Sequence, residues 1–237
     1  MMYLSRVHLR LEHLKPDMML KWKVATPYAA HQWLWQLFPG QTERSFLFRQ
    51  EPQGRFFVLS EYPPLTQHDL FFVETKPFNP LIKEGQEFDF QLRANPVITR
   101  QNKRYDVLMD AKYQARARGV LKEKWWNIQI NAACQWLEIQ GDNHGFILID
   151  RSFEEFNRWA GAENESYSTR GQACVKSYQQ HSFQRQAGQK PIMYSSVDFT
   201  GMLRITDAVR FQQALYQGLG KSKSLGCGLL MIKRPAS

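Results

Sequence analysis

The chain divides at Asn79-Pro-Leu-Ile-Lys-Glu-Gly85, which is followed almost at once by the alternating run Phe88-Asp-Phe-Gln-Leu-Arg93. Proline and glycine close together are typical of a linker, and the alternation of apolar and polar residues with period two is typical of a half-buried strand. A new folding unit therefore starts after the linker. We expect a domain boundary near residue 84, with one domain over 1–84 and a second over 85–237.

The first 84 residues carry the signals of one mixed unit of helix and sheet. Thr26-Pro27 offers an N-cap and a first-turn proline for a short helix over about 28–38, which Pro39-Gly40 ends. A further short helix is expected after the hairpin. The expected strands cover residues 3–11, 46–49, 55–61 and 70–75. The resulting order is β-α-β-β-α-β.

The second part repeats that order. The expected strands cover 88–93, 145–150, 176–185, 193–205 and 229–232, and the expected helices cover 125–139 and 207–217. Between 100 and 124 apolar periodicity weakens, which indicates a basic insertion or a long hairpin. Two consecutive units of this order predict an α+β fold of tandem ferredoxin-like (RRM-like) domains. Enzymes and RNA-binding modules both use this fold, so it does not decide the function.

Composition narrows the classes of function. The 237 residues carry a net charge of +9 and a pI near 9.5, which favours a polyanionic partner, above all nucleic acid. No apolar run is long enough for a membrane span, and the N-terminus alternates where a signal peptide would be apolar, so a cytoplasmic protein is expected. The three cysteines are widely separated and the six histidines form no His-Glu-x-x-His pair. We therefore expect no metal and no cofactor.

A glycine-rich basic segment precedes the last expected strand. Its glycines and lysines are Gly218, Gly220, Lys221, Lys223, Gly226 and Gly228. Glycine lets a phosphodiester approach the main chain and permits positive φ, so peptide N–H groups and ammonium groups can meet one anion. The spacing fits neither a Walker A loop nor a dinucleotide fingerprint. A simple turn between a helix and an edge strand stays open as the alternative.

Tyr28 and His31 are three residues apart, on one face of the expected helix 28–38 and near its positive end. An imidazole exchanges a proton near neutral pH, and a phenol can orient a hydroxyl group. RNA supplies its own nucleophile, the 2′-hydroxyl, so this pair would suffice without a metal. The alternative is that His31 is an ordinary helix residue.

The segment 100–124 is the main candidate for gripping RNA. Its candidate contacts are Arg100, Lys103, Arg104, Arg116 and Arg118. Tyr105 and Tyr113 lie among these charges, and the mixture suits phosphate contact combined with stacking. A solvated surface is the alternative.

Five blocks of sequence together resemble one known family. They are Met2-Tyr-Leu-Ser-Arg-Val7, Tyr28-Ala-Ala-His-Gln-Trp-Leu-Trp-Gln-Leu-Phe-Pro39, Phe46-Leu-Phe-Arg49, Phe90-Gln-Leu-Arg-Ala-Asn-Pro96 and Gly218-Leu-Gly-Lys-Ser-Lys-Ser-Leu-Gly-Cys-Gly228. In this order they resemble the CasE (Cse3) family, the CRISPR-associated endoribonucleases of type I-E systems. The resemblance implies tandem ferredoxin-like domains, metal-independent cleavage at the base of the CRISPR repeat hairpin, and retention of the product in the Cascade complex.

The resemblance also implies roles for single residues. His31 matches the family's catalytic histidine, Tyr28 the tyrosine beside it, and the segment 218–228 the glycine-rich RNA-binding loop. The reaction it implies is internal transesterification, which gives a 2′,3′-cyclic phosphate and a 5′-hydroxyl. Two alternatives remain at this point: a noncatalytic subunit that binds an RNA hairpin, and a scaffold that contacts proteins through exposed aromatics such as Trp125 and Trp126.

Overall fold

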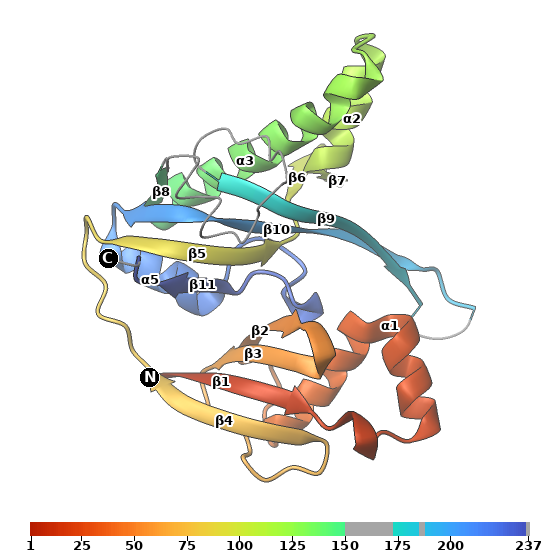
Figure 1. The fold of residues 1–237 in the computed structure, drawn as a ribbon, viewed down its shortest axis with the longest axis vertical. Helices are drawn as coiled ribbons and strands as arrows, with labels where there is room; N and C mark the ends of the chain where they lie inside the picture. The colour runs from red at the N-terminus through yellow and green to blue at the C-terminus, as the bar shows by residue number, and fades with distance from the viewer. Residues whose placement is uncertain (150–172, 185–187, 236–237) are drawn as a thin grey trace.

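The computed structural model describes residues 1–149, 173–184 and 188–235. In these ranges it contains a four-stranded and a five-stranded antiparallel sheet, one above the other in Figure 1. The lower sheet has the order β2-β3-β1-β4. Its strands are β1 (Met2–Leu9), β2 (Phe46–Glu51), β3 (Arg55–Ser60) and β4 (Phe71–Phe78). Read from β4, the order is fourth, first, third, second, which is the ferredoxin-like arrangement.

The upper sheet repeats that arrangement in the order β11-β5-β10-β8, with β9 also paired to β10. Its strands are β5 (Glu87–Ala94), β8 (Phe146–Ile149), β9 (Ala173–Phe183), β10 (Ile192–Ile205) and β11 (Leu230–Lys233). The helices α3 (Trp125–His144) and α5 (Ala208–Gln217) belong to this unit. The α+β fold of tandem ferredoxin-like domains is thus confirmed. The connection over 79–86 holds neither helix nor strand.

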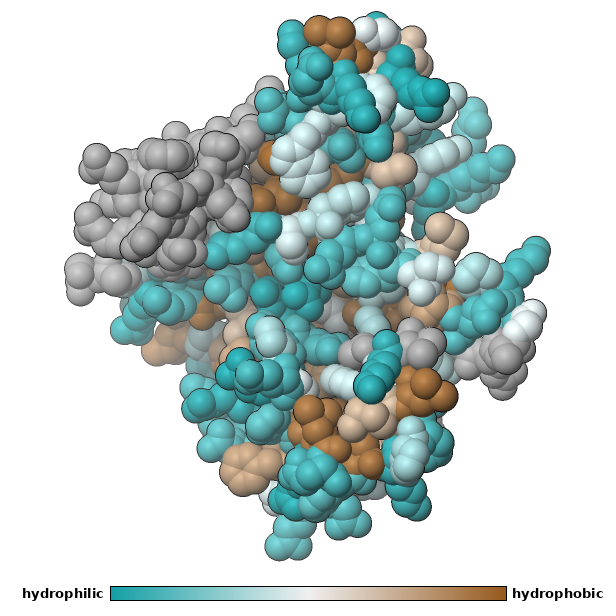
Figure 2. All heavy atoms as spheres, turned by 45° about the vertical axis from the view of Figure 1, so that its right-hand side comes forward, coloured by the Kyte–Doolittle hydropathy of each residue, from teal (hydrophilic) through white to brown (hydrophobic). Residues whose placement is uncertain are grey.

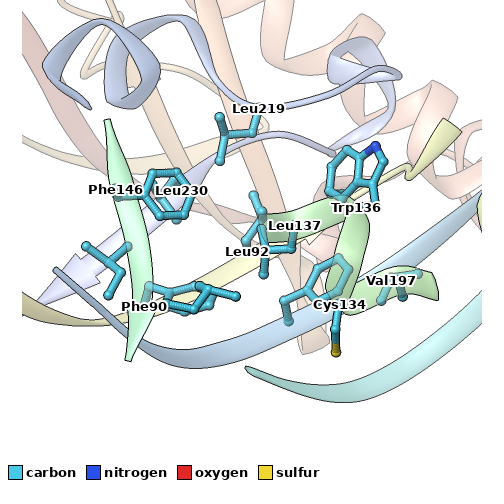
Figure 3. Close-up of a cluster of buried hydrophobic side chains, with 14 of the residues drawn as sticks. Phe90, Leu92, Cys134, Trp136, Leu137, Phe146, Val197, Leu219 and Leu230 are labelled. Atoms are coloured by element: carbon cyan, nitrogen blue, oxygen red, sulfur yellow. The ribbon is translucent and has the colours of Figure 1, made fainter. Parts of the chain in front are cut away.

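The core of the upper unit follows from the alternation in β5. Phe90 and Leu92 point to one side of the sheet, where they meet Trp136 and Leu137 of α3 (Figure 3). Each of these four side chains is buried. Because successive residues of a strand point to opposite faces, Arg93 is left on the other face, which is turned toward the lower unit.

The first helix is longer than the sequence predicted. α1 runs from Pro16 to Leu34 and continues as the 3-10 turn η2 (Trp35–Leu37). Pro16 occupies the first turn and Asp17 adds a negative charge there, both of which favour a helix start. The expected start at Thr26-Pro27 was wrong, because these residues lie inside the helix.

α1 bends sharply on itself. The rings of Trp22 and Trp33 stack with centroids 5.5 Å apart, whereas residues eleven positions apart on a straight helix would be separated by about 16 Å. Pro27 lies between them and removes one helical hydrogen bond, the usual cause of a kink. Figure 1 shows the two arms of α1 at an angle. Trp22 packs on the lower core through the edge of Phe56.

This geometry overturns the helix-dipole argument for His31. His31 lies in the last turn of α1, not in the first, so the positive end of the helix is at Pro16. The backbone N–H groups near His31 belong to a continuing helix. Any anion at His31 must therefore be held by side chains or by other segments.

Two further expectations for secondary structure were wrong. The chain over 61–70 contains no helix, because Pro63-Pro64 restrict the backbone and the N–H of Leu65 bonds the carbonyl of Leu37 at 2.9 Å. In the segment 100–124, the long hairpin is replaced by a short one, of β6 (Val97–Arg100) and β7 (Lys103–Asp106). It then forms the helix α2 (Val107–Ala117), whose N-cap Asp106 accepts a hydrogen bond from the N–H of Met109 at 2.8 Å.

The two units are joined by an apolar and an ionic contact. Leu47 and Leu59 of the lower sheet pack against Leu229 of the upper unit. Beside them, Nη2 of Arg49 on the lower sheet lies 3.7 Å from Oδ1 of Asp198 in the upper unit, and Nη1 of Arg93 in the upper unit donates to the carbonyl of Gln50 at 2.9 Å. These contacts fix the relative position of the segments that line the cavity between the units.

No helix in the described ranges is long and apolar enough to cross a membrane.

Candidate functional site

A cavity of about 680 Å³ lies between α1, the segment 38–41, the far end of the β9–β10 hairpin and the glycine-rich loop. Figure 1 shows the end of that hairpin reaching down beside α1. The cavity is lined by Tyr28, His31, Gln32, Trp35, Gln36, Phe38, Pro39, Gly40, Gln41, Phe183, Ile192, Ser224 and Leu225. The fold thus brings the Tyr28/His31 pair and the terminal loop to one place, although nearly two hundred residues separate them.

Tyr28 is held from two sides. Its hydroxyl accepts a hydrogen bond from Nε2 of Gln32, one helical turn on, at 3.0 Å. Its ring stacks on Phe183 of β9, with centroids 5.7 Å apart and planes 23° apart. Phe183 is buried, so the upper unit supplies a fixed wall against which the phenol rests.

His31 lies among aromatic rings. Trp35 meets it edge-on at 5.5 Å, and Phe46 and Phe48 of β2 lie at 6.0 and 6.4 Å. Its Nε2 is buried and has no hydrogen-bond partner within the part of the chain that the structure describes. Burial lowers the pKa of His31 below its ordinary value, and the positive charge of Arg44 lowers that pKa further. The imidazole is therefore neutral at pH 7, with a nitrogen available for a substrate atom.

The glycine-rich loop has the positive φ angles that its glycines permit, but the glycines face the protein. A Cβ on Gly218 would lie 2.8 Å from both the carbonyl oxygen of Gly228 and the Cδ1 of Leu47, and one on Gly226 would lie 3.2 Å from the ring of Phe48. Our expectation that missing side chains make room for a phosphodiester was wrong at these positions. They make room for the loop to pack on β2.

Hydrogen bonds to the upper unit anchor this loop. Nδ2 of Asn95 donates to Oγ of Ser222 at 2.7 Å, and the backbones of Asn95 and Lys221 form an isolated β-bridge. The N–H of Gly228 donates to the carbonyl of Arg93 at 2.7 Å. The loop is consequently a fixed wall of the cavity, with Ser224 and Leu225 presented to it.

Three cations gather beside the cavity. Burial lowers the pKa of Lys223 most, and the positive charges of Arg44 and Lys221 lower it further. The charge of Arg44 also lowers the pKa of His31, so these groups lie near one another. Nζ of Lys223 donates to the carbonyl of Gln217 at 2.6 Å. Among the described residues, none of the three cations forms an ion pair with a carboxylate. Unneutralised cations next to a cavity favour an anionic ligand in it.

The basic segment does not line this cavity. Arg100, Lys103 and Arg104 lie on β6 and β7, and Arg116 and Arg118 lie at the end of α2, all at the far end of the upper unit in Figure 1. Arg100 pairs with Asp110 at 3.0 Å. Figure 2 shows hydrophilic side chains over most of this upper part and apolar ones gathered lower down, over the unit that carries α1.

Three residues of this region, Gln32, Phe183 and Arg44, are not among the candidates that the sequence suggests. Gln32 stands four residues after Tyr28, a helical spacing that does place the two side chains together, so this contact was within reach. Phe183 and Arg44 gave no such signal, because their position depends on the packing of one unit against the other. Within the described ranges, no group of three or more His, Cys, Asp and Glu residues could hold a metal ion.

Tandem ferredoxin-like units that enclose a histidine, a tyrosine and a fixed basic loop define a class of α+β proteins with a pocket between the two units. The chain belongs to the CRISPR associated protein family, whose model matches residues 2–234.

Two relatives with known names support this placement. The chain is similar to the CRISPR system Cascade subunit CasE of Escherichia coli (strain K12), with 25% identity over 213 residues that cover 86% of this chain and 90% of that protein. It is also similar to the CRISPR-associated endoribonuclease Cse3 of Thermus thermophilus, with 28% identity over 159 residues that cover 66% of this chain and 60% of that protein.

Solved structures share the fold. Cse3 bound to a 19-nucleotide RNA aligns with a TM-score of 0.68 and 24% identity, covering 98% of this chain and 100% of that one. Thermus thermophilus Cse3 bound to an RNA that represents a pre-cleavage complex aligns with a TM-score of 0.68 and 23% identity, and the alignment covers 98% of each chain. Cas6e from Escherichia coli K-12 aligns with a TM-score of 0.55 and 23% identity, and the alignment covers 98% of this chain and 100% of that one.

Proposed function

We propose that the protein is an endoribonuclease that cleaves precursor CRISPR RNA at the repeat hairpin and keeps the product as part of Cascade. The names of its relatives, a Cascade subunit and a CRISPR-associated endoribonuclease, support this function. The observation that carries it is the buried Nε2 of His31, which has no partner among the described residues, in a cavity beside three cations that form no ion pair within the described ranges. A buried polar atom without a hydrogen-bond partner destabilises the folded protein. Such an atom is expected in a binding site, where a substrate atom supplies the missing partner.

The proposed reaction is an internal transesterification. Nε2 of His31 takes the proton of the 2′-hydroxyl, the 2′ oxygen forms a bond to phosphorus, and the bond from phosphorus to the 5′ oxygen breaks. Water that enters the open cavity protonates that leaving oxygen. The products are a 2′,3′-cyclic phosphate and a 5′-hydroxyl. A neutral imidazole suits the base role, because only the unprotonated form accepts a proton.

Tyr28 and the three cations have separate roles in this reaction. The hydroxyl of Tyr28 accepts a hydrogen bond from Gln32 and can act as a donor to an RNA oxygen, and Phe183 fixes the direction of the ring. Lys221, Lys223 and Arg44 stabilise the negative charge that develops on the phosphate. Gly218, Gly220, Gly226 and Gly228 shape the loop that presents the two lysines.

We assign the RNA stem to the upper unit, with Arg100, Lys103, Arg104, Arg116 and Arg118 as phosphate contacts. We propose a domain boundary near residue 84, with domains over 1–84 and 85–237, and the connection between β4 and β5 supports it. The reaction is proposed to need no metal or cofactor, and a cytoplasmic location fits a partner complex that meets transcripts there.

The function is tested with a repeat hairpin that carries a single 2′-deoxy nucleotide just before the cut. The protein is expected to cut the all-ribose RNA, in EDTA as well as without it, and to bind but leave intact the deoxy RNA. Cleavage of the deoxy RNA, or activity that EDTA abolishes and magnesium restores, would contradict internal transesterification. Tight binding of both RNAs with no cleavage would favour the noncatalytic alternative.

A further inference from the structure

A second cavity, of about 690 Å³, adjoins the first. It is lined by His13, Lys15, Met18, Gln36, Gln67, His68, Asp69 and Leu70. Gln36 lines both cavities, so one side chain separates them. The walls of the first cavity come from both units, whereas every residue of the second belongs to the lower unit.

The polar groups of this second cavity have defined donor and acceptor roles. Nδ1 of His13 lies 2.8 Å from the carbonyl of Asp69, an acceptor, so Nδ1 carries a proton and is the donor in this contact. Nδ1 of His68 accepts from the N–H of Leu70 at 3.1 Å, so Nε2 is left as a donor. Burial is the main reason why the pKa of His68 is lowered, which keeps this ring neutral.

The lining therefore combines one ammonium group, two imidazoles and two amides. Lys15 offers a single strong contact to a phosphate, and Gln36 and Gln67 offer the paired donors and acceptors that read the edge of a base. The carboxylate of Asp69 makes the cavity unsuited to a dense run of phosphates. A volume of this size holds one unpaired nucleotide but no duplex.

We propose that this second cavity binds single-stranded RNA that continues past the cut, on the side away from the hairpin. The proposal rests on the function proposed above. A strand that comes from the upper unit and places its phosphate at His31 leaves the first cavity across Gln36, and the second cavity lies directly beyond. The site would hold the strand that departs with the 5′-hydroxyl and so fix the register of the cut.

The test compares two uncleavable hairpins, each with a 2′-deoxy nucleotide before the cut. One ends directly after the cut, and the other continues for several nucleotides. The unchanged protein is expected to bind the longer RNA more tightly. Lys15→Gln and Gln67→Ala are each expected to weaken binding of the longer RNA by about threefold to tenfold, the loss of one directed polar contact, and to leave the shorter RNA unaffected.

Lys76→Gln serves as the control, because Lys76 is an exposed cation on β4 outside both cavities. Equal affinity of the unchanged protein for the two hairpins would overturn the proposal. Equal weakening of both RNAs by Lys15→Gln, or the same selective loss in Lys76→Gln, would overturn it as well. Cleavage of the matching all-ribose hairpin tests the proposed function separately, since that reaction needs no flanking strand to be bound.

Discussion

The ring of Phe183, from the upper unit, stacks on the ring of Tyr28, from the lower unit, at 5.7 Å. This contact crosses the domain interface at the wall of the cavity. The phenol is thus oriented by a strand that the first domain does not contain. A first domain without the second would keep His31 and Tyr28 but lose the surface that holds Tyr28 in one direction.

We expect Phe183→Leu to slow single-turnover cleavage by about fivefold to tenfold at saturating RNA, because an aromatic pair contributes about 1 kcal/mol beyond its buried area. Phe183→Tyr keeps a stacked ring and is expected to cut at nearly the normal rate. Equal rates for the leucine variant and the unchanged protein would show that Tyr28 needs no such support.

The acid–base behaviour of His31 provides a second prediction. Burial and the charge of Arg44 lower its pKa, so in RNA-free protein its imidazole resonance should titrate below pH 6.5, its ordinary value. Arg44→Gln removes the repulsion but not the burial, so the midpoint should rise toward the ordinary value. NMR titration measures the midpoint of His31 in the unchanged protein and in Arg44→Gln. The resonance is assigned by its loss in His31→Ala.

Lys76→Gln is the matched control for that titration, because it removes an exposed positive charge that is not among those acting on His31. Its midpoint should equal that of the unchanged protein. A midpoint above 6.5 in the unchanged protein, or no rise in Arg44→Gln, would contradict the arrangement described for this pocket.

The packing of the terminal loop yields a third prediction. Gly218→Ala adds a Cβ that would lie 2.8 Å from a backbone oxygen at φ +75°, whereas Gly119→Ala, at φ +71°, meets nothing within 4 Å. Backbone strain alone costs about 1–2 kcal/mol. We expect Gly119→Ala to lower the free energy of unfolding by about 1–2 kcal/mol, and Gly218→Ala to lower it clearly more. Urea unfolding measures both changes. Equal losses would mean that the loop has room to move away from β2.

A fourth prediction concerns the basic end of α2. Replacing Arg116 and Arg118 by glutamine should flatten the slope of log affinity against log salt for the hairpin by about one to two units, since each phosphate contact contributes about 0.9. The control replaces Arg55 and Lys76, exposed cations of the lower sheet, and should leave the slope unchanged. A flattening only in the control would place the RNA stem on the lower unit.

Most strands of the two sheets could be predicted from the sequence, because the alternation of apolar and polar residues that marks a strand is a local pattern. The alternation in 88–93 and 193–205 marks β5 and β10, and Asp207 caps α5 at the expected residue by accepting from the N–H of Arg210 at 3.0 Å. The start of α1 was missed because two prolines, Pro16 and Pro27, each offer a helix start, and only tertiary packing decides between them. The stack of Trp22 on Trp33 stabilises a helix that begins at the first proline and bends at the second.

The site was only partly accessible from the sequence. The pairing of Tyr28 with His31 follows from helical spacing, whereas their environment depends on contacts between units. The neighbourhood of Arg44 and Lys223, and the wall that Phe183 forms, require the relative placement of two sheets that no local pattern encodes. The glycines of the loop were read correctly as positions of positive φ, but the side to which they face became clear only from the packing on Phe48 and Leu47.

The most direct test of the account is single-turnover cleavage of repeat RNA by His31→Ala, with hairpin affinity and the melting transition measured on the same protein. We expect cleavage to slow by at least about a hundredfold, the usual scale for the loss of a general base, while affinity and melting change little. Cleavage at nearly the normal rate by this folded variant would contradict the central claim that His31 moves the proton.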